Sequence, residues 1–524
     1  MWHGNGVQEA GDCHTSPSAM QTNALEFLNR TVARFPDRTA VRDAGGAYTF
    51  EELRRAALEL AAVLVARADA TNTPIAVYLP KSKEAVLCFA AILYSGNCYA
   101  PLDVKSPAAR LSAVLQKLGP SLIVTNRANL AELCKAGAPL DRVVVLEDAP
   151  SCEVTPELER RFERVLDTDP IYIIHTSGST GIPKGVTIAH RGVVDYIDWA
   201  NSVYTVDEST VIGSQAPFHF DNSTLDIYLC FSRGATLDLI PAELFLFPVK
   251  LIEYMRACGI NFVFWVPSVL MQVANMDILA HTELPPLEQI LFAGEVMPCK
   301  QLNYWRKWFP NALFSNLYGP TEITVDCTYY IVSREMADDE PLPIGFPCRN
   351  SDVLILNAED RPAAVGERGE LCVRGSSLAL GYWNDPEKTA AAFVQNPLQP
   401  HYPERLYRTG DLVYRNEAGE IVFTGRADQQ IKHMGYRIEL GEIETAVLSL
   451  PEVRNACAVY DHAKSQIVLF FEGERELNAG AIRKALGPLL PKYMFPSVCT
   501  QMASLPVNPN GKTDRKALAA MLES

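Results

Sequence analysis

Strand-like and helix-like segments alternate along this 524-residue chain, and this alternation restricts its possible folds more than any other feature. The apolar runs 74–79, 122–125 and 143–146 have the length and composition of short buried strands. Residues 84–94 have the apolar spacing of a helix. Strands separated by helices predict parallel sheets that carry helices on their faces.

A helix is predicted to begin directly after Thr49. Glu52 stands three residues further on, which is the spacing of a capping box. The apolar residues that follow fall on one helical face: Leu53, Ala57, Leu60 and Leu64.

The character of the chain changes near residues 425–428. Beyond them the pattern predicts a helix over 439–450, strands over 456–460 and 466–471, and a helix over 479–486. We therefore expect a loose tail over 1–19, a large domain over 20–427 and a small, mobile α+β domain over 428–524.

Composition excludes several classes of function. A formal net charge of -15 and a pI near 5.2 disfavour binding to nucleic acid or to an anionic membrane. The 13 cysteines include no Cys-x-x-Cys pair, which disfavours a zinc or dithiol site, and their odd number favours a reducing cytoplasm. Residues 1–19 lack the features of a signal peptide, and no apolar run reaches the roughly 20 residues that span a membrane.

Residues 176–185 form a loop rich in glycine and hydroxyl side chains that follows the apolar run 172–175. The ten residues Thr-Ser-Gly-Ser-Thr-Gly-Ile-Pro-Lys-Gly offer three glycines, four hydroxyls and one lysine, a set suited to a polyphosphate. Lys184 is followed by Gly185, so this is not the loop of P-loop enzymes, and no Gly-x-Ser-x-Gly elbow is present. An ordinary flexible loop is the alternative.

The loop resembles the phosphate loop of the adenylate-forming superfamily, and specifically of the adenylation domains of nonribosomal peptide synthetases. Further motifs follow in the family's order, so that the resemblance spans about residues 48–518. They are Tyr-Gly-Pro-Thr-Glu at 318–322, Gly-Glu-Arg-Gly-Glu-Leu at 366–371, Gly-Tyr at 381–382, Tyr-Arg-Thr-Gly-Asp at 407–411, the segments 425–432 and 435–439, and Asn-Gly-Lys-Thr-Asp-Arg at 510–515.

This resemblance implies an α/β fold with a large adenylate-forming domain, a β-barrel-like subdomain and a small C-terminal α+β domain. It also implies a ligase that uses ATP and Mg²⁺ to adenylate an amino acid, releases pyrophosphate and passes the acyl group to the phosphopantetheine thiol of a carrier protein. The chain ends soon after the last motif, so we expect the carrier to be a separate protein. Asp428 is the expected hinge.

The resemblance assigns an ATP site. Lys512, Thr176 and Glu322 are the expected catalytic residues, Glu322 is the expected magnesium ligand, and Lys512 is expected to bridge the two substrates. The expected ATP-binding residues are Thr176, Ser177, Gly178, Ser179, Thr180, Gly181, Lys184, Asn316, Tyr318, Thr321, Asp411, Phe423, Arg426 and Lys512.

The resemblance also assigns an amino-acid pocket in which Asp221 binds the substrate ammonium. The alternative for Asp221 is a helix cap, because a helix-like run follows it. The expected lining is Asp221, Asn222, Leu225, Phe264, Leu291, Ala293, Gly294, Leu317, Val325 and Asp326.

This pocket is mostly apolar and is similar to those of proline-activating enzymes, except at Asn222 and Asp326. An ionised Asp326 in the pocket would favour a diamino, β-amino or other polar acid. Alternatively, Asp326 points away or bonds to Asn222, and a proline-like substrate remains. Two other functions compete: an acyl-CoA synthetase, which generally lacks the Asp221 carboxylate, and a catalytically silent nucleotide-binding homologue.

Overall fold

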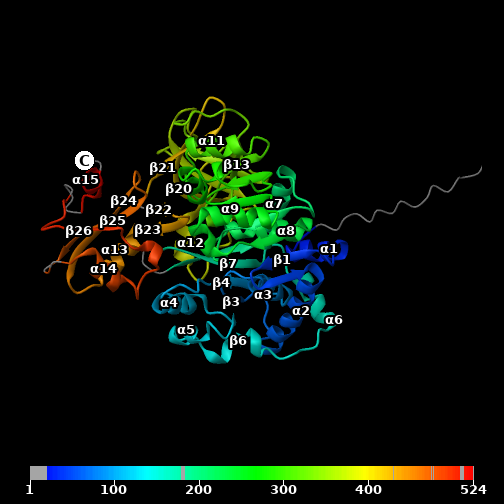
Figure 1. Ribbon diagram of the computed structural model, residues 1–524. Coiled ribbons are helices and arrows are strands. Elements are labelled where there is room, and N and C mark those ends of the chain that lie inside the picture. The colour runs from blue at the N-terminus through cyan, green and yellow to red at the C-terminus, as the bar shows by residue number, and fades with distance from the viewer. Residues whose placement is uncertain are drawn as a thin grey trace, which may run out of the picture.

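The computed structural model describes residues 21–178, 183–428, 430–473, 475, 477–507 and 513–522. Two large sheets dominate the fold. One has nine strands in the order β15-β14-β13-β12-β11-β9-β10-β1-β2, and the other has seven in the order β18-β8-β7-β4-β3-β5-β6. In Figure 1 the blue and cyan N-terminal part lies below the green middle of the chain, and the orange C-terminal part lies beside both.

The nine-stranded sheet is parallel in its centre and antiparallel at both edges. At one edge β1 and β2 form a short hairpin, and at the other β14 and β15 return along the sheet after longer connections; the alternation of strands and helices predicted neither. Its strands are β1 (Thr39–Asp43), β2 (Gly46–Thr49), β9 (Val211–Ser214), β10 (Thr236–Leu239), β11 (Phe262–Trp265), β12 (Gln289–Phe292), β13 (Leu313–Tyr318), β14 (Thr328–Ile331) and β15 (Phe346–Pro347).

The seven-stranded sheet contains the three strands predicted near the N-terminus, and all three are confirmed. It is parallel except where β8 pairs with β7 and β18. Its strands are β3 (Pro74–Tyr78), β4 (Cys98–Pro101), β5 (Leu122–Thr125), β6 (Val143–Val145), β7 (Pro170–Thr176), β8 (Lys184–Ala189) and β18 (Gly381–Tyr382).

Side chains that alternate along the central strands divide between three apolar cores. Phe264 and Leu291 face the core shared by the two large sheets, whereas their neighbours Val263 and Ile290 face a second core on the outer side of the nine-stranded sheet. Ala76 likewise faces a third core beside the other sheet. Strands buried on both faces read as continuous apolar runs, which is why they were visible in the sequence.

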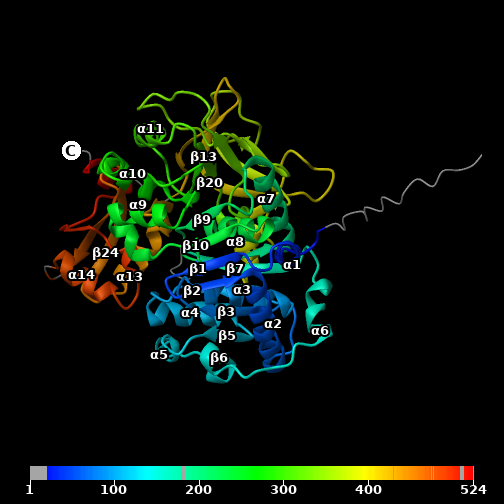
Figure 2. The same ribbon diagram turned by 45° about the vertical axis from the view of Figure 1, so that its right-hand side comes forward.

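Helices cover both sheets, as the alternation predicted (Figure 2). The capping box at the start of α2 is confirmed, because Thr49 accepts a hydrogen bond from the Glu52 amide and Glu52 accepts one from the Thr49 amide. The helices up to residue 310 are α1 (Leu25–Arg34), α2 (Phe50–Arg67), α3 (Lys83–Tyr94), α4 (Ala108–Leu118), α5 (Leu130–Lys135), α6 (Pro156–Glu159), α7 (His190–Val203), α8 (Asn222–Arg233), α9 (Pro248–Ala257), α10 (Pro267–Asn275) and α11 (Cys299–Trp308).

A five-stranded antiparallel sheet follows the nine-stranded one and corresponds to the expected barrel-like subdomain. Strand β20 lies at its centre and pairs with β17, β19 and β21. The strands are β16 (Ser351–Leu356), β17 (Gly369–Gly375), β19 (Phe393–Gln395), β20 (Arg405–Arg415) and β21 (Ile421–Arg426), with helix α12 (Pro386–Ala392) between β18 and β19.

The end of the chain forms a smaller α+β domain with its own apolar core. The predicted elements are present, although α13 is shorter than the predicted helix 439–450. The exact boundary at residue 428 stays a prediction. The elements are β22 (Gln430–His433), β23 (Tyr436–Glu439), α13 (Leu440–Leu448), β24 (Val453–Asp461), β25 (Gln466–Gly473), α14 (Ala479–Leu486), β26 (Val498–Gln501) and α15 (Arg515–Ala520).

Among the described residues, none of the helices combines the length and the apolar composition that crossing a bilayer requires.

Candidate active site

The glycine-rich loop joins β7 to β8, two antiparallel neighbours in which Thr176 stands opposite Lys184. The Thr176 hydroxyl is buried and makes no hydrogen bond within the described residues. Burial lowers the pKa of the Lys184 ammonium, and nearby Arg437 lowers it further. The loop thus brings an unsatisfied hydroxyl and a desolvated cation together. Ser179, Thr180 and Gly181 lie outside the described residues.

Ser177 and Glu322, which the sequence assigned to phosphate and metal, both contact Arg437 of the small domain. The Ser177 hydroxyl donates to the Arg437 carbonyl over 2.7 Å, and the Arg437 guanidinium lies 2.6 Å from a Glu322 carboxylate oxygen. The Tyr382 hydroxyl donates to the other Glu322 oxygen. Burial alone would raise the pKa of Glu322, but the charges of Arg437 and Lys184 outweigh it and lower that pKa to about 2.

The predicted adenine and ribose residues form a second group beside the first. The Tyr318 hydroxyl donates to Asp411, and the Arg426 guanidinium lies 2.5 Å from the other Asp411 oxygen. The Phe423 ring lies 6.4 Å from the Tyr318 ring, centre to centre. Asn316, two residues before Tyr318 on β13, donates to the Pro343 carbonyl instead.

Asp428, the predicted hinge residue, is held by the same arginine. The Arg426 guanidinium makes two 2.6 Å hydrogen bonds to its carboxylate. These contacts lower the pKa of Asp428 against the opposing effect of burial. Arg426 therefore links the predicted ribose site to the predicted hinge.

Asp221 occupies the N-cap position of α8, as the helix-cap alternative placed it, but its side chain makes no capping hydrogen bond. Burial raises the pKa of its carboxyl group, while a hydrogen bond from the Thr321 hydroxyl lowers it. Thr321 directly precedes Glu322 in the chain. The predicted ammonium-binding residue thus lies beside the predicted phosphate residues.

Asp326 lies near Asp221, but its partner is a residue that the sequence did not suggest. The Tyr196 hydroxyl of α7 donates to Asp326 over 2.6 Å. Burial raises the pKa of Asp326 to about 8. The Asp221 charge also raises this pKa, whereas the hydrogen bond from Tyr196 lowers it. The alternative in which Asp326 bonds to Asn222 is wrong, because the Asn222 side-chain nitrogen is buried and has no partner within the described residues.

The turn after Tyr318 explains why glycine stands at position 319. Thr324 and Val325 have φ values of 58° and 70°, a left-handed conformation that is strained for a β-branched residue. This turn folds back onto Gly319, where a Cβ atom would lie 2.2 Å from the Val325 carbonyl oxygen. This close approach holds the Asp326 backbone against Gly319, the residue that directly follows β13.

The remaining predicted pocket residues meet where neighbouring strands of the nine-stranded sheet end. Phe264 and Leu291 are register partners on β11 and β12, and Leu317 lies on the next strand. Residues Leu225, Phe264, Leu291, Ala293, Leu317 and Val325 are all buried and belong to one apolar core. Gly294, with a φ of 94°, follows them in a loop.

The small domain covers this site. The Gly435 amide donates to Glu295 over 2.7 Å, and the Tyr436 ring packs edge-on against Phe220. The ammonium of half-buried Lys432 lies 5.6 Å from the centre of the Tyr318 ring. Lys512 lies outside the described residues.

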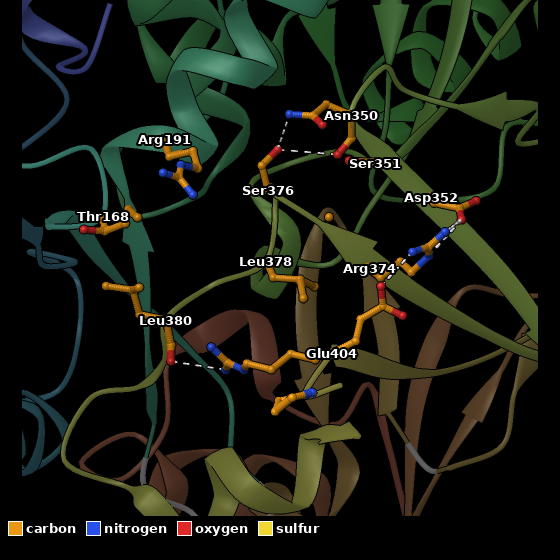
Figure 3. Close-up of a pocket in the computed structure, with 14 residues that line it drawn as sticks. Thr168, Arg191, Asn350, Ser351, Asp352, Arg374, Ser376, Leu378, Leu380 and Glu404 are labelled. Carbon is orange, nitrogen blue, oxygen red and sulfur yellow. Dashed lines mark hydrogen bonds and ion pairs between the residues drawn. The ribbon is translucent and has the colours of Figure 1, made fainter. Parts of the chain in front are cut away.

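Two open cavities lie elsewhere and contain none of the predicted site residues. One of about 610 Å³ lies beside β17 and β20, where Arg374 pairs with Asp352 and Glu404 (Figure 3). The other, of about 710 Å³, lies between α1, α7 and α8. Side chains of the small domain contact the predicted site instead, Arg437 at Glu322 and Lys432 at the Tyr318 ring.

Comparison with known proteins assigns the family. The family described as "AMP-binding enzyme" matches residues 28–383, more than half of the chain. The chain belongs to this family. It is therefore a ligase of the adenylate-forming type, as the resemblance implied.

Among the relatives of this AMP-binding enzyme, two match along almost their whole length. One is the L-proline--[L-prolyl-carrier protein] ligase of Pseudomonas fluorescens, 32% identical over 95% of this chain and 99% of that protein. Another is zwittermicin A synthase ZmaJ of Bacillus cereus, 32% identical over 96% of this chain and 95% of that protein. The chain matches gramicidin S synthase 2 of Brevibacillus brevis at 33% identity but spans 11% of its length.

Solved structures show the same fold. Holo-PA1221, described as a nonribosomal peptide synthetase protein with adenylation and PCP domains, is 26% identical, with a TM-score of 0.81 over 95% of this chain and 84% of that chain. IdnL1 is 28% identical, with a TM-score of 0.79 over 93% of this chain and 98% of that chain. This AMP-binding enzyme is thus adenylate-forming, of the nonribosomal peptide synthetase type.

The environment of Glu322 in this AMP-binding enzyme fits a bound cation. Its carboxylate is fully buried and ionised, and a guanidinium neutralises it. Within the described part of the chain, no cluster of three or more His, Cys, Asp or Glu side chains is arranged to hold a metal. Mg²⁺ is often held by one or two carboxylates together with substrate phosphates, and Glu322 would supply one such carboxylate.

Sequence reasoning missed three side chains of this site. Tyr196 gave no signal, because it lies in an ordinary helical pattern 130 positions from Asp326. Arg437 and Tyr382 stand inside recognised motifs, but their contacts with Glu322 depend on how distant segments pack. A search for cations inside the motifs would have found Arg437.

Proposed function

We propose that this enzyme adenylates a small amino acid with ATP and then transfers the aminoacyl group to the phosphopantetheine thiol of a separate carrier protein. The single observation that carries the proposal is Asp221, a half-buried carboxyl group whose pKa is raised by desolvation and lowered by the Thr321 hydroxyl of the nucleotide segment. A carboxylate that loses its water of hydration needs a cationic partner. A substrate ammonium supplies one within reach of the phosphate residues.

In the first half-reaction the substrate carboxylate attacks the α-phosphorus of ATP. A new bond forms between the carboxylate oxygen and phosphorus, and the bond to pyrophosphate breaks. Thr176, Ser177 and Lys184 would hold the outgoing phosphates, and Thr321 would contact the α-phosphate. Holding both reactants in line and neutralising charge accounts for the catalysis. Glu322 would hold Mg²⁺, whose charge offsets that of the phosphates.

The nucleoside would lie between Tyr318 and Phe423, with Asp411 on the ribose hydroxyls and Arg426 beside them. Lys512 would bridge the substrate carboxylate and the nucleotide. These roles rest on the family motifs. The grouping of Tyr318, Asp411 and Arg426 by hydrogen bonds supports them.

In the second half-reaction the carrier thiol attacks the acyl carbon, and AMP leaves with the electron pair of the broken C–O bond. The small domain would rotate about Asp428 between the two steps, a recognised means of gating an active site. The contacts of Gly435 and Tyr436 with the large domain support an arrangement in which this segment faces the site.

The class of amino acid that this enzyme activates depends on whether Asp326 contacts the substrate. Its hydrogen bond to Tyr196 engages one carboxyl oxygen, and the Asn222 side-chain nitrogen has no partner within the described residues. A proline-like acid would leave these groups unused, whereas a β-amino, diamino or other polar acid would engage them. We therefore keep both classes in the proposal.

ATP–pyrophosphate exchange with proteinogenic, β-amino, diamino and fatty acids tests the function. Exchange with one or a few small amino acids is expected. Asp326→Cys separates the two substrate classes, because it should abolish exchange with a second-amine substrate and preserve or improve exchange with proline. Exchange with fatty acids alone would indicate an acyl-CoA synthetase, and no exchange with any acid would indicate a silent homologue.

A further inference from the structure

A lysine outside the nucleotide site joins the two large sheets next to the loop that carries Asp221. Lys81 stands between β3 and α3, and its ammonium donates to the carbonyls of Ser214 and Gln215 over 2.9 and 3.2 Å. Ser214 is the last residue of β9 in the other sheet. No motif of the sequence analysis included Lys81.

The charged groups that act on Lys81 are two buried aspartates, Asp226 on α8 and Asp238 on β10. Asp238 already has a cation, since Arg42 lies 2.5 Å from it. Asp226 has no ion pair within 4 Å in the described part of the chain, and burial raises its pKa to about 7, while the Ser214 hydroxyl and the Lys81 charge lower it. Both Asp226 carboxyl oxygens lack a hydrogen-bond partner within the described residues, and Lys81 is the cation whose charge lowers the pKa of Asp226.

The carbonyls that Lys81 holds are at the start of the segment 215–221, which ends at Asp221. Asp226 lies further along α8, the helix that begins at Asn222. One ammonium thus fixes the strand end before the segment and acts on the helix after it. Hydrogen bonds to charged donors are stronger than neutral ones. The segment also carries Phe220, which packs against Tyr436 of the small domain.

We propose that Lys81 is a positioning residue that fixes the 215–221 segment and, through it, the placement of Asp221 for the substrate ammonium. Lys81 itself contacts no reacting group. The kinetic part of this inference rests on the proposed function, whereas its structural part does not. Lys81→Met removes the charge and the donors, Lys81→Arg keeps both, and Lys300→Met at an exposed position is the matched control.

Hydrogen–deuterium exchange on the full chain tests the structural part without any substrate. Lys81→Met is expected to raise amide exchange in segment 214–222 by about tenfold or more, because a hydrogen bond to a charged donor contributes about 1.5–3 kcal/mol. Strand β13, with Tyr318, should keep its protection. Lys81→Arg and Lys300→Met should match the unsubstituted chain. Unchanged protection of 214–222 in a folded Lys81→Met chain overturns the proposal.

Pyrophosphate exchange tests the kinetic part with the acid, among L-proline, glycine, β-alanine and L-2,3-diaminopropionate, that the unsubstituted chain activates best. Lys81→Met should raise the KM for that acid by about tenfold or more on the same reasoning and change the KM for ATP less than about twofold. A purely structural role would lower the apparent kcat or raise both KM values to the same extent, and that result refutes positioning.

A pH profile gives a second kinetic readout. Burial lowers the pKa of Lys81 to about 8, so the unsubstituted enzyme should lose affinity for the amino acid as pH rises through that value. Lys81→Arg stays charged and should remove this limb of the profile; a limb that persists in Lys81→Arg belongs to another group and counts against the proposal. If no acid supports exchange while Lys81→Met still loosens segment 214–222, the proposed function fails and the positioning role stands.

Discussion

Replacing Arg437 with methionine is expected to strengthen ATP binding and to slow acyl transfer. Arg437 occupies both of the groups that we assign to the metal and the phosphates, Glu322 through its side chain and Ser177 through its carbonyl. ATP with its metal therefore competes with this arrangement of the small domain. Methionine has a similar length but cannot neutralise Glu322.

The size of the effect follows from the burial of Glu322, which is inaccessible to solvent and ionised. Removing one partner of a buried ion pair costs about 3–5 kcal/mol. In Arg437→Met this cost destabilises only the arrangement in which residue 437 faces Glu322. The lower figure corresponds to about a hundredfold change in an equilibrium constant. Water that enters beside Glu322 lowers this free-energy cost, so we expect ATP to bind at least about tenfold more tightly.

Isothermal titration of the full chain with ATP and magnesium, without amino acid, measures this affinity directly. Transfer of the radiolabelled acyl group to a phosphopantetheinylated carrier measures the second step, which should slow in Arg437→Met. Arg454→Met changes an exposed arginine of the same domain and should alter neither value. Unchanged or weaker ATP binding in folded Arg437→Met would refute the competition between Arg437 and the nucleotide.

Four further outcomes are expected. Asp221→Asn should lower kcat/KM for the amino acid by about a hundredfold, as expected for a charged hydrogen bond lost in a buried site, while titration shows ATP binding unchanged; equal loss of both would contradict its role. Burial raises the pKa of Asp326 to about 8, so the native chain keeps a proton that the unfolded chain releases above about pH 4. Asp326 therefore lowers stability as pH rises between these values, by at most about 1.4 kcal/mol per pH unit, and Asp326→Asn should remove that decline in urea unfolding at about pH 5 and pH 8. Thr49→Ala should cost about 1 kcal/mol of unfolding free energy through the lost capping box, and an unchanged melting temperature argues against that cost. Asp428→Pro should impair acyl transfer and pyrophosphate exchange to different extents; equal impairment is incompatible with a hinge.

Local patterns predicted much of the fold. The capping box at Thr49, the apolar strands of the seven-stranded sheet and most elements of the small domain were visible, because each depends on a few neighbouring residues. The strand order was not, since β9 lies between β10 and β11 through contacts that no local pattern encodes. The antiparallel edges were missed for the same reason.

The candidate site likewise contains residues that the sequence predicted and contacts that it did not. Motifs identified Tyr318, Asp411 and Arg426, and the structure brings them into contact. The partner of Asp326 was unpredictable, because α7 must lie beside the turn that precedes β14 before Tyr196 reaches it. Buried polar groups find their partners through tertiary packing, so spacing in the sequence carries little information about them.

The alternation of side chains along β11 and β12 has a consequence for how such an enzyme can change. Phe264 and Leu291 face the predicted substrate pocket, while Val263 and Ile290 support the outer core. Mutation can therefore reshape one side of a strand while the other side keeps the domain folded. Single substitutions at alternate positions would thus change the pocket and the shared core together while leaving the outer core unchanged, so a lineage that acquires a new substrate in this way needs stability in reserve only for the shared core.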